Sequence, residues 1–185
     1  IGIALISIAV LSLIVAVPVF SNNYTYNFEK STAGWESTGM WHIINETSQY
    51  RNANSGNSSF WYGNDLTGTY DSGTANSGRL VSPPINLKGS DKTTLTFWYW
   101  YQTETMGNRY DQRFVHIREA GSQEWEEIDQ LYDDPMSQWL QKTYDISKYN
   151  GKVIEVSFYF DMADGLANDY RGWYIDDVEI QVEKK

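Results

Sequence analysis

The sequence predicts a mainly β protein: a two-sheet antiparallel β-sandwich of the jelly-roll type, preceded by one long hydrophobic α-helix. Three observations support this prediction. Residues 1–20 contain no charged side chain, the chain beyond Pro18 alternates between apolar and polar residues, and Gly and Asn separate the alternating runs. A period of two is typical of strands, and many short strands broken by turn residues are typical of sandwiches.

Residues 1–20, IGIALISIAVLSLIVAVPVF, are too hydrophobic to remain in water. At ~1.5 kcal/mol or more per buried aliphatic side chain, their exposure would cost on the order of 20 kcal/mol. A helix of this length measures ~30 Å, which is the thickness of the hydrocarbon core of a bilayer. Four interpretations are open: a cleaved signal peptide, a plain membrane anchor, a donor strand for a neighbouring molecule, and a pilin helix.

Small residues on this segment favour the pilin interpretation. Gly2, Ala9 and Ala16 recur every seven residues, and Ser12 lies beside them at helical spacing. Such a stripe lets helix backbones approach closely, so we predict these four residues as the interface between filament subunits. A chain that starts at Ile1 and enters the apolar run directly resembles a mature type IV pilin-like subunit.

The fifth residue refines this resemblance. Bacterial type IV pilins usually carry Glu at the fifth mature position, where this chain has Leu5. The resemblance is therefore closer to archaeal pilins and archaellins, and it covers residues 1–20 only. It implies a subunit that is anchored in the membrane before assembly and then self-associates into a helical filament outside the cell.

Length and composition place the rest of the chain in one domain. After a linker at 21–23, residues 24–185 are enough for a single domain. The net charge of −10 argues against nucleic acid as a partner and against basic contacts with anionic lipid. The absence of cysteine excludes disulfides and thiol chemistry.

Strands are predicted wherever apolar side chains occupy every second position. They are expected at 24–29, 40–44, 58–62, 79–82, 93–102, 112–119, 124–129, 139–146, 152–161 and 172–182. Asn150-Gly151 predicts a tight hairpin turn with positive φ. The long loops expected at 63–78, 103–111 and 162–171 are where binding usually resides on a sandwich.

Several motifs occur in an order that resembles a known group of surface domains. The most specific are SPPINL at 82–87 and the closing GWYIDDV at 172–178. The others are NFE, GWESTGMWHI, SFWYG, LTFWYWY, YDQRFVHI and YDISKYNGK. Together they resemble the MAM-like, concanavalin-type jelly roll that accompanies immune-inhibitor-A-type secreted peptidases. The resemblance covers roughly residues 26–182 and implies a non-catalytic domain for adhesion or accessory binding, with calcium in several members.

The sequence shows no catalytic pattern, so we expect no enzyme activity. His42 and His116 are far apart, and each lies in an apolar run where a packed or surface histidine is the usual role. The motifs of zinc peptidases, serine hydrolases and P-loop enzymes do not occur.

Carboxylates in two places suggest Ca²⁺, a cation that needs several oxygen ligands. Asp176 and Asp177 interrupt an apolar run, and alternation turns Asp176 inward. A buried carboxylate must be paired or must coordinate a cation, and the family pattern suggests Glu29 as the partner. The second candidate set consists of Glu104, Asp111 and Asp161. The alternative for both sets is a hydrogen-bonded or salt-bridged network, in the second set with Arg113 or Arg171.

Two further features concern glycans. Sequons at Asn23, Asn45 and Asn57 predict glycosylation of an extracellular chain. Trp98 and Trp100 share one strand face. If that face is open, their rings could stack on sugars; the other interpretation, which the usual burial of large aromatic side chains favours, is that they are packed.

Two functions from different classes therefore compete. The first is a structural subunit of an archaeal type IV pilus-like filament, with the helix in the core and an outer, adhesive jelly roll. The second is a monomeric, membrane-anchored surface module that binds glycans or peptides. Electron microscopy of the native protein is expected to show filaments in the first case and separate particles in detergent in the second.

Overall fold

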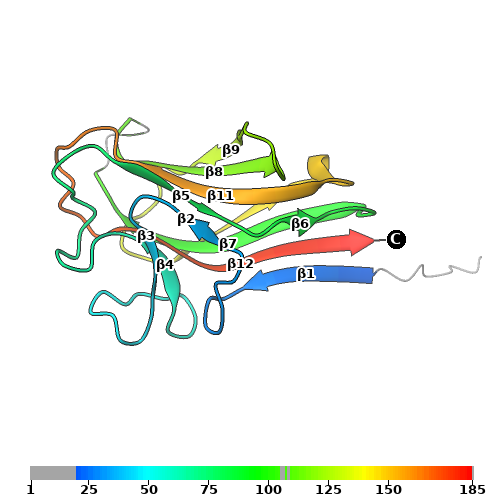
Figure 1. Cartoon of the computed structure of the whole chain (residues 1–185), viewed down its shortest axis with the longest axis horizontal. Helices are drawn as coiled ribbons and strands as arrows, with labels where there is room; N and C mark the ends of the chain where they lie inside the picture. Colours follow the sequence, from blue (N-terminus) through cyan, green and yellow to red (C-terminus); the bar gives the residue numbers. More distant parts are fainter. Residues whose placement is uncertain (1–19, 105–106, 108, 185) are drawn as a thin grey trace, which may run out of the picture.

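The computed structural model describes residues 20–104, 107 and 109–184, and Figure 1 shows their path. All but the last residue of the predicted helix at 1–20 lies outside the described residues. The same holds for the predicted filament interface, Gly2, Ala9, Ser12 and Ala16. Within the described ranges, no helix has the length and hydrophobicity needed to cross a bilayer.

The described residues form two antiparallel sheets, which we name the β7 sheet and the β11 sheet after a long central strand of each. The β7 sheet has the order β10-β7-β12-β4-β3, with β1 paired to β12. Its strands are β1 (Phe20–Tyr26), β3 (Trp41–Ile44), β4 (Ser59–Tyr62), β7 (Lys92–Gln102), β10 (Leu140–Asp145) and β12 (Gly172–Lys184).

The β11 sheet has the order β2-β5-β11-β8-β9, with β6 paired to β11. Its strands are β2 (Glu36–Ser37), β5 (Ser77–Val81), β6 (Ile85–Asn86), β8 (Gln112–Glu119), β9 (Glu126–Gln130) and β11 (Val153–Asp161). One 3-10 turn, η1 (Ser147–Tyr149), lies between β10 and β11. The predicted two-sheet antiparallel sandwich is thus confirmed.

Most predicted strands agree closely with the structure. The run at 112–119 matches β8 residue for residue, and each of the other runs overlaps one strand. The short strands β2 and β6 were not predicted, because two residues are too few to show an alternation of apolar and polar side chains.

The first strand differs from its prediction at both ends. Residues 21–23, predicted as a linker, pair with residues 181–183 of β12, so this part of the chain is strand. The pairing depends on hydrogen bonds to a distant segment, which the polar side chains of 21–23 do not reveal. β1 ends at Tyr26 rather than at residue 29, since Phe28 has a left-handed φ of 59° that ends the extended conformation.

The turn at Asn150-Gly151 is present, but the hairpin prediction is wrong. Asn150 has φ −53° and ψ 140°, so only Gly151, with φ 85°, is left-handed, as in a type II turn. The flanking strands β10 and β11 belong to different sheets. The turn therefore carries the chain from one sheet to the other.

The core between the sheets is rich in aromatic rings. Alternate residues of β7 and β11, including Phe97 and Phe158, are fully buried and face each other. Phe158 packs edge-on against Phe97, with centroids 4.8 Å apart, and against Trp173, with centroids 6.0 Å apart. Because such rings bury ~150–250 Å² each, their packing is a major source of stability.

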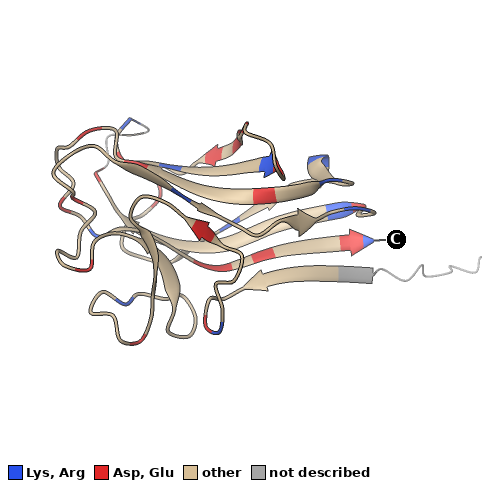
Figure 2. Cartoon of the chain, in the orientation of Figure 1, with Lys and Arg blue, Asp and Glu red and all other residues tan. Residues whose placement is uncertain are grey.

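The start of β1 and the finish of β12 lie at one end of the sandwich, and the long loops lie at the other. β1 begins and β12 finishes at the same end, on the right in Figure 1, because the two strands pair antiparallel. The long loops that follow β4 and β11 lie at the opposite end, and the backbone N–H of Tyr70 joins them by donating to the carbonyl of Tyr170 (3.1 Å). Acidic residues recur along these loops, as Figure 2 shows.

Candidate functional site

The outer face of the β7 sheet carries an apolar cluster that is closed to solvent. This outer cluster consists of Ile44, Trp61, Trp100 and Tyr174, with Tyr50 and Trp139 packed against it. The rings of Trp61 and Tyr174 are fully buried and stack with centroids 5.6 Å apart. Trp100 keeps only 9% of its surface exposed, which confirms its predicted burial, whereas Trp98 stays partly exposed. These two tryptophans therefore do not form a pair of open rings.

The segment 45–58 between β3 and β4 covers the outer cluster, and we call it the covering loop. The carbonyl of Tyr50 accepts hydrogen bonds from the guanidinium of Arg171 (3.0 Å) and the hydroxyl of Tyr174 (3.2 Å). Arg171, predicted as an ion-pair partner of the second carboxylate set, thus holds the covering loop instead.

Asp176 and Asp177 on β12 anchor the covering loop. The carboxylate of Asp176 is fully buried and accepts backbone N–H bonds from Asn54 (2.8 Å) and Ser55 (3.2 Å). Asp177 accepts bonds from the side chains of the same two residues, each at 2.8 Å. Burial, reinforced by the charge of Asp177, raises the pKa of Asp176 to about 7.

Asp176 is buried, as predicted, but on the opposite side of the sheet. A β-bulge follows it, and Asp177 takes a left-handed φ of 46°. An extra residue in the strand shifts the alternation, so Ile175 and Val178 both reach the core while Tyr174 joins the outer cluster. The predicted inward direction of Asp176 is therefore wrong.

Glu29 holds the other end of the covering loop. Its carboxylate accepts the backbone N–H groups of Asn57 (2.9 Å) and Ser58 (2.7 Å). Gly56 lies against this carboxyl group with φ +57°, and a Cβ there would come within 2.4 Å of the carboxyl carbon of Glu29. The close approach and the left-handed backbone both require glycine.

Three of the predicted metal ligands meet at one loop. Glu29, Asp176 and Asp177 all bind donors of the covering loop, as in the predicted hydrogen-bonded alternative. Among the residues that the structure describes, no three carboxylates or histidines are grouped so that they could hold a metal ion. Binding of Ca²⁺ stays a prediction.

The second predicted set is divided in the structure. Asp111 is 1% exposed and accepts the backbone N–H of Glu104 at 2.9 Å. Burial raises the pKa of Asp111 to about 6. Arg113, also buried, donates to the backbone carbonyl of Asp111 at 3.3 Å. Asp161 bonds elsewhere, to the hydroxyl of Tyr159 at 3.2 Å.

The three predicted glycosylation sites are all exposed. They are Asn23 on β1 and Asn45 and Asn57 on the covering loop. The amide of Asn23 donates to Glu179 on the paired strand β12 (3.1 Å), while those of Asn45 and Asn57 accept from nearby residues, Thr47 (2.8 Å) and Arg51 (3.0 Å). Their glycosylation stays a prediction.

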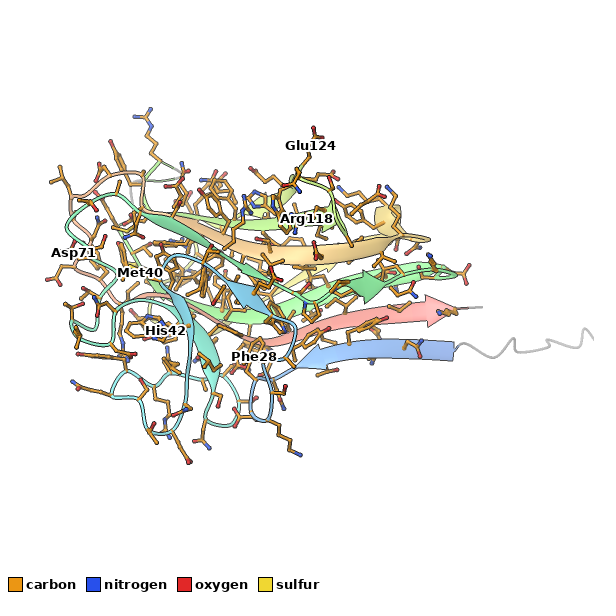
Figure 3. All side chains as sticks on the ribbon, viewed as in Figure 1. Phe28, Met40, His42, Asp71, Arg118 and Glu124 are labelled. Atoms are coloured by element: carbon orange, nitrogen blue, oxygen red, sulfur yellow. The ribbon has the colours of Figure 1, made fainter. Side chains whose placement is uncertain are left out.

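The two histidines lie on different sheets. Nδ1 of His42 on β3 lies 2.9 Å from the carbonyl of Met40, and its Nε2 lies 3.3 Å from a carboxylate oxygen of Asp65. Figure 3 shows His42 and Met40 near each other. His116 lies on β8 of the other sheet. The predicted lack of enzyme activity stays a prediction.

The outer face of the β11 sheet carries a different group of rings. This aromatic face consists of Phe114 and His116 on β8, Tyr159 on β11 and Trp125 just before β9, and none of the four belongs to either apolar cluster. The ring of Phe114 stacks with those of His116 and Tyr159, with centroids 5.4 and 6.1 Å apart. Phe114, Tyr159 and Trp125 are all partly exposed.

Two arginines complete this face. The Cζ atom of Arg79 on β5 lies 4.1 Å from the ring centroid of Tyr159 and 5.0 Å from that of Trp125. The Cζ atom of Arg118 on β8 lies 4.3 Å from the ring of Trp125. In Figure 3, Arg118 lies beneath the β8–β9 turn that bears Glu124. Guanidinium groups over indole and phenol rings are attracted by the negative faces of those rings.

The neighbouring guanidinium fixes the protonation state of His116. Nη1 of Arg79 lies 2.9 Å from Nδ1 of His116. A guanidinium can only donate, so Nδ1 must accept and the imidazole must be neutral. Burial and the charge of Arg79 accordingly lower the pKa of His116 to about 4.

A cleft of about 670 Å³ adjoins the aromatic face. Its lining includes Arg118, Glu124, Trp125, Tyr149 and Lys152. Because Arg118 and Trp125 belong to both the cleft and the aromatic face, one elongated ligand can contact the two together.

The aromatic face was not predicted from the sequence, although the alternation of one strand indicates part of it. The alternation in 112–119 places Phe114, His116 and Arg118 on one side of the strand, opposite Val115 and Ile117. The contributions of Arg79 and Trp125 depend on the strand order β5-β11-β8-β9, which no local pattern contains.

Comparisons with known proteins place this geometry in context. No model of a known protein family matches the chain. Bacillopeptidase F of Bacillus subtilis is 32% identical over 168 residues, which make up 88% of this chain and 11% of that protein. The chain thus corresponds to a small part of the length of this relative.

Several solved structures share the fold at low sequence identity. A cleaved adhesin domain of Lys-gingipain has a TM-score of 0.56 and 16% identity, over 85% of this chain and 97% of that one; a second such domain, from Porphyromonas gingivalis, has a TM-score of 0.52, 17% identity and coverages of 89% and 99%. TmCBM61 in complex with β-1,4-galactotriose has a TM-score of 0.51 and 15% identity, with coverages of 80% and 88%. The described part of the chain is therefore a jelly-roll sandwich of the kind found in adhesin domains and carbohydrate-binding modules.

Proposed function

We propose that the chain is a non-catalytic, extracellular surface module that binds glycans on the outer face of the β11 sheet. The observation that supports this proposal is the partial exposure of Phe114, Tyr159 and Trp125, whose rings are left out of both apolar clusters. A structure with the same fold, TmCBM61, is bound to a galactose trisaccharide.

The chemistry of the aromatic face suits a sugar. One side of a pyranose ring is lined by C–H groups, which pack on the faces of aromatic rings, while its hydroxyls need hydrogen-bond partners. Phe114, Tyr159 and Trp125 offer partly exposed rings, and Arg79, which uses only its Nη1 within the described residues, offers donors. The row of groups runs from β5 across β11 and β8 to the residue before β9, so an oligosaccharide fits it better than a single sugar.

The filament proposal has less support. It depends on residues 1–20, and the described residues contribute nothing to it. The MAM-like resemblance and the match to one tenth of Bacillopeptidase F both suit an accessory binding domain. A membrane anchor at residues 1–20 stays part of the proposal for a surface module.

A glycan array followed by titration calorimetry tests the proposal with two matched variants. Trp125→Ala removes a ring from the aromatic face and should weaken glycan binding at least tenfold. Trp98→Ala removes a partly exposed tryptophan from the outer side of the other sheet and should leave binding unchanged. The proposal is wrong if the protein binds peptides and no glycan, or if Trp98→Ala is the variant that loses binding.

A further inference from the structure

Arg79 carries a positive charge on the aromatic face, and no carboxylate of the described residues is paired to it. Its Nη1 donates to Nδ1 of His116 (2.9 Å) and to the hydroxyl of Ser157 (3.2 Å), and both acceptors are neutral. None of the ion pairs found among the described residues includes Arg79. Arg118, by contrast, is paired with Glu155 at 2.6 Å.

This unpaired charge is unexpected in so acidic a chain. Acidic residues number 24 and basic residues 14, so a counter-ion for Arg79 would be easy to supply from the protein itself. Desolvation and the nearby charge of Arg118 both act against the charged form of Arg79 and lower its pKa. An anion bound beside Arg79 would relieve both costs.

The guanidinium of Arg79 is also held ready for a ligand. The rings of Tyr159 and Trp125 flank it, and Nη1 is fixed by His116. Its Nε and Nη2 groups have no hydrogen-bond partner in the described part of the chain, and neither atom is completely buried. These donors form the planar fork that matches the two oxygens of a carboxylate.

Resting on the proposed glycan-binding function, we infer that the ligand is an acidic polysaccharide and that a uronic-acid carboxylate pairs with Arg79. The sugar ring packs on the parts of Trp125 or Tyr159 that the guanidinium of Arg79 leaves uncovered, while its carboxylate meets the free donors of that guanidinium. A charge-assisted hydrogen bond contributes ~1.5–3 kcal/mol, which corresponds to a tenfold to hundredfold gain in affinity.

The sharpest test compares two forms of one polymer. Polygalacturonate carries free carboxylates, and its methyl-esterified form has the same backbone without the charge. Affinity electrophoresis and calorimetry should show at least tenfold tighter binding of the free acid, and the difference should shrink as salt screens the pair. Equal affinity for the two forms, or a preference for a sulfated glycan over the uronate, overturns the inference.

Three variants assign the preference to Arg79. Arg79→Gln should bind both polymer forms with the affinity that the wild type has for the esterified form. Arg79→Lys, which keeps the charge but loses the planar fork, should retain part of the preference. Arg109→Gln removes the same charge from an exposed position on the loop between β7 and β8 and should keep the full preference.

The outcomes separate this inference from the proposed function. If the protein binds neutral glycans through Trp125 and ignores the uronate, the inference fails and glycan binding stands. If no glycan binds in any form, both fail. If Arg79→Gln, with an unchanged melting temperature, still prefers the free acid, the carboxylate does not pair with Arg79 and the inference fails.

Discussion

The outer faces of the two sheets are made of similar residues but differ in their exposure to solvent. Each carries clustered aromatic rings beside an arginine: Trp61 and Tyr174 with Arg171 on the β7 sheet, and Trp125 and Tyr159 with Arg79 on the β11 sheet. On the first face the covering loop encloses the rings, and the arginine bonds to that loop. On the second face the rings stay partly exposed, and within the described residues Arg79 uses only its Nη1 as a donor, so that its Nε and Nη2 are left without a partner.

This comparison shows that aromatic content alone does not identify a binding face. The hydrogen bonds of the covering loop decide the outcome on the β7 sheet. Asp176 on β12 accepts its backbone N–H groups, Glu29 accepts two more, and Arg171 donates to the carbonyl of Tyr50. The β11 sheet therefore offers the better candidate for a ligand.

The largest expected difference concerns stability. Trp61→Ala empties a fully buried site and removes the indole bond to the carbonyl of Arg171 (2.6 Å), so it should lower the free energy of unfolding by ~3–5 kcal/mol. Trp125→Ala removes a partly exposed ring and should cost less than ~1 kcal/mol. Urea denaturation of both variants gives the two values. Equal costs would mean that Trp125 is core and that the aromatic face is no ligand surface.

The second difference is in the direction of pH dependence. The pKa of Asp176 is raised to about 7 in the folded protein, above ~3.9 in the unfolded chain, so its contribution makes stability fall as pH rises from 4 to 7. The pKa of His116 is lowered to about 4, below ~6.5 in the unfolded chain, so its contribution makes stability fall as pH drops from 6.5 to 4.

Single variants separate these opposing contributions, which are at most ~4 kcal/mol for Asp176 and ~3 kcal/mol for His116. Between pH 4 and 7, the slope of unfolding free energy against pH should be more positive in Asp176→Asn than in the wild type. In His116→Gln the same slope should be more negative than in the wild type. Denaturant titrations at several pH values provide the slopes, and variants with the wild-type slope would show that the two side chains are not buried as described.

A smaller effect is expected from calcium. If Ca²⁺ binds the carboxylates around the covering loop, saturation at a hundred times the Kd adds ~2.7 kcal/mol to stability. A chelator should then lower the melting temperature of the wild type by several degrees, and Asp177→Asn should respond much less. An unmoved wild-type unfolding curve would leave Glu29, Asp176 and Asp177 as hydrogen-bond anchors only.

Local periodicity explains which parts of the fold could be predicted. The run at 112–119 alternates cleanly, and it forms β8 over the same residues. Asp176 could be predicted as buried because an acid within an apolar strand needs partners, but the β-bulge beside it reversed its direction. A bulge is set by the backbone of Asp177, and the sequence of that strand carries no mark of it.

Long-range contacts explain what could not be predicted. Residues 21–23 form strand only because β12 lies beside them. The covering loop packs on the β7 sheet through Tyr50, which lies 124 positions before its partner Tyr174. The meeting of Arg79 with Trp125 likewise requires the order of four strands, so the candidate site emerges only from the folded sheet.

The pairing of β1 with β12 has a mechanical consequence. The hydrogen bonds of antiparallel strands run perpendicular to the strands. A pull on residue 20 along the strand axis, against a ligand held on the β11 sheet, would load all the β1–β12 bonds in shear, from the pair Phe20–Lys184 to the pair Tyr26–Val178. A force that pulled Phe20 away from Lys184 would instead break the same bonds one after another. We therefore expect the β1–β12 pair to resist a pull along β1 far better than a force that separates these two residues.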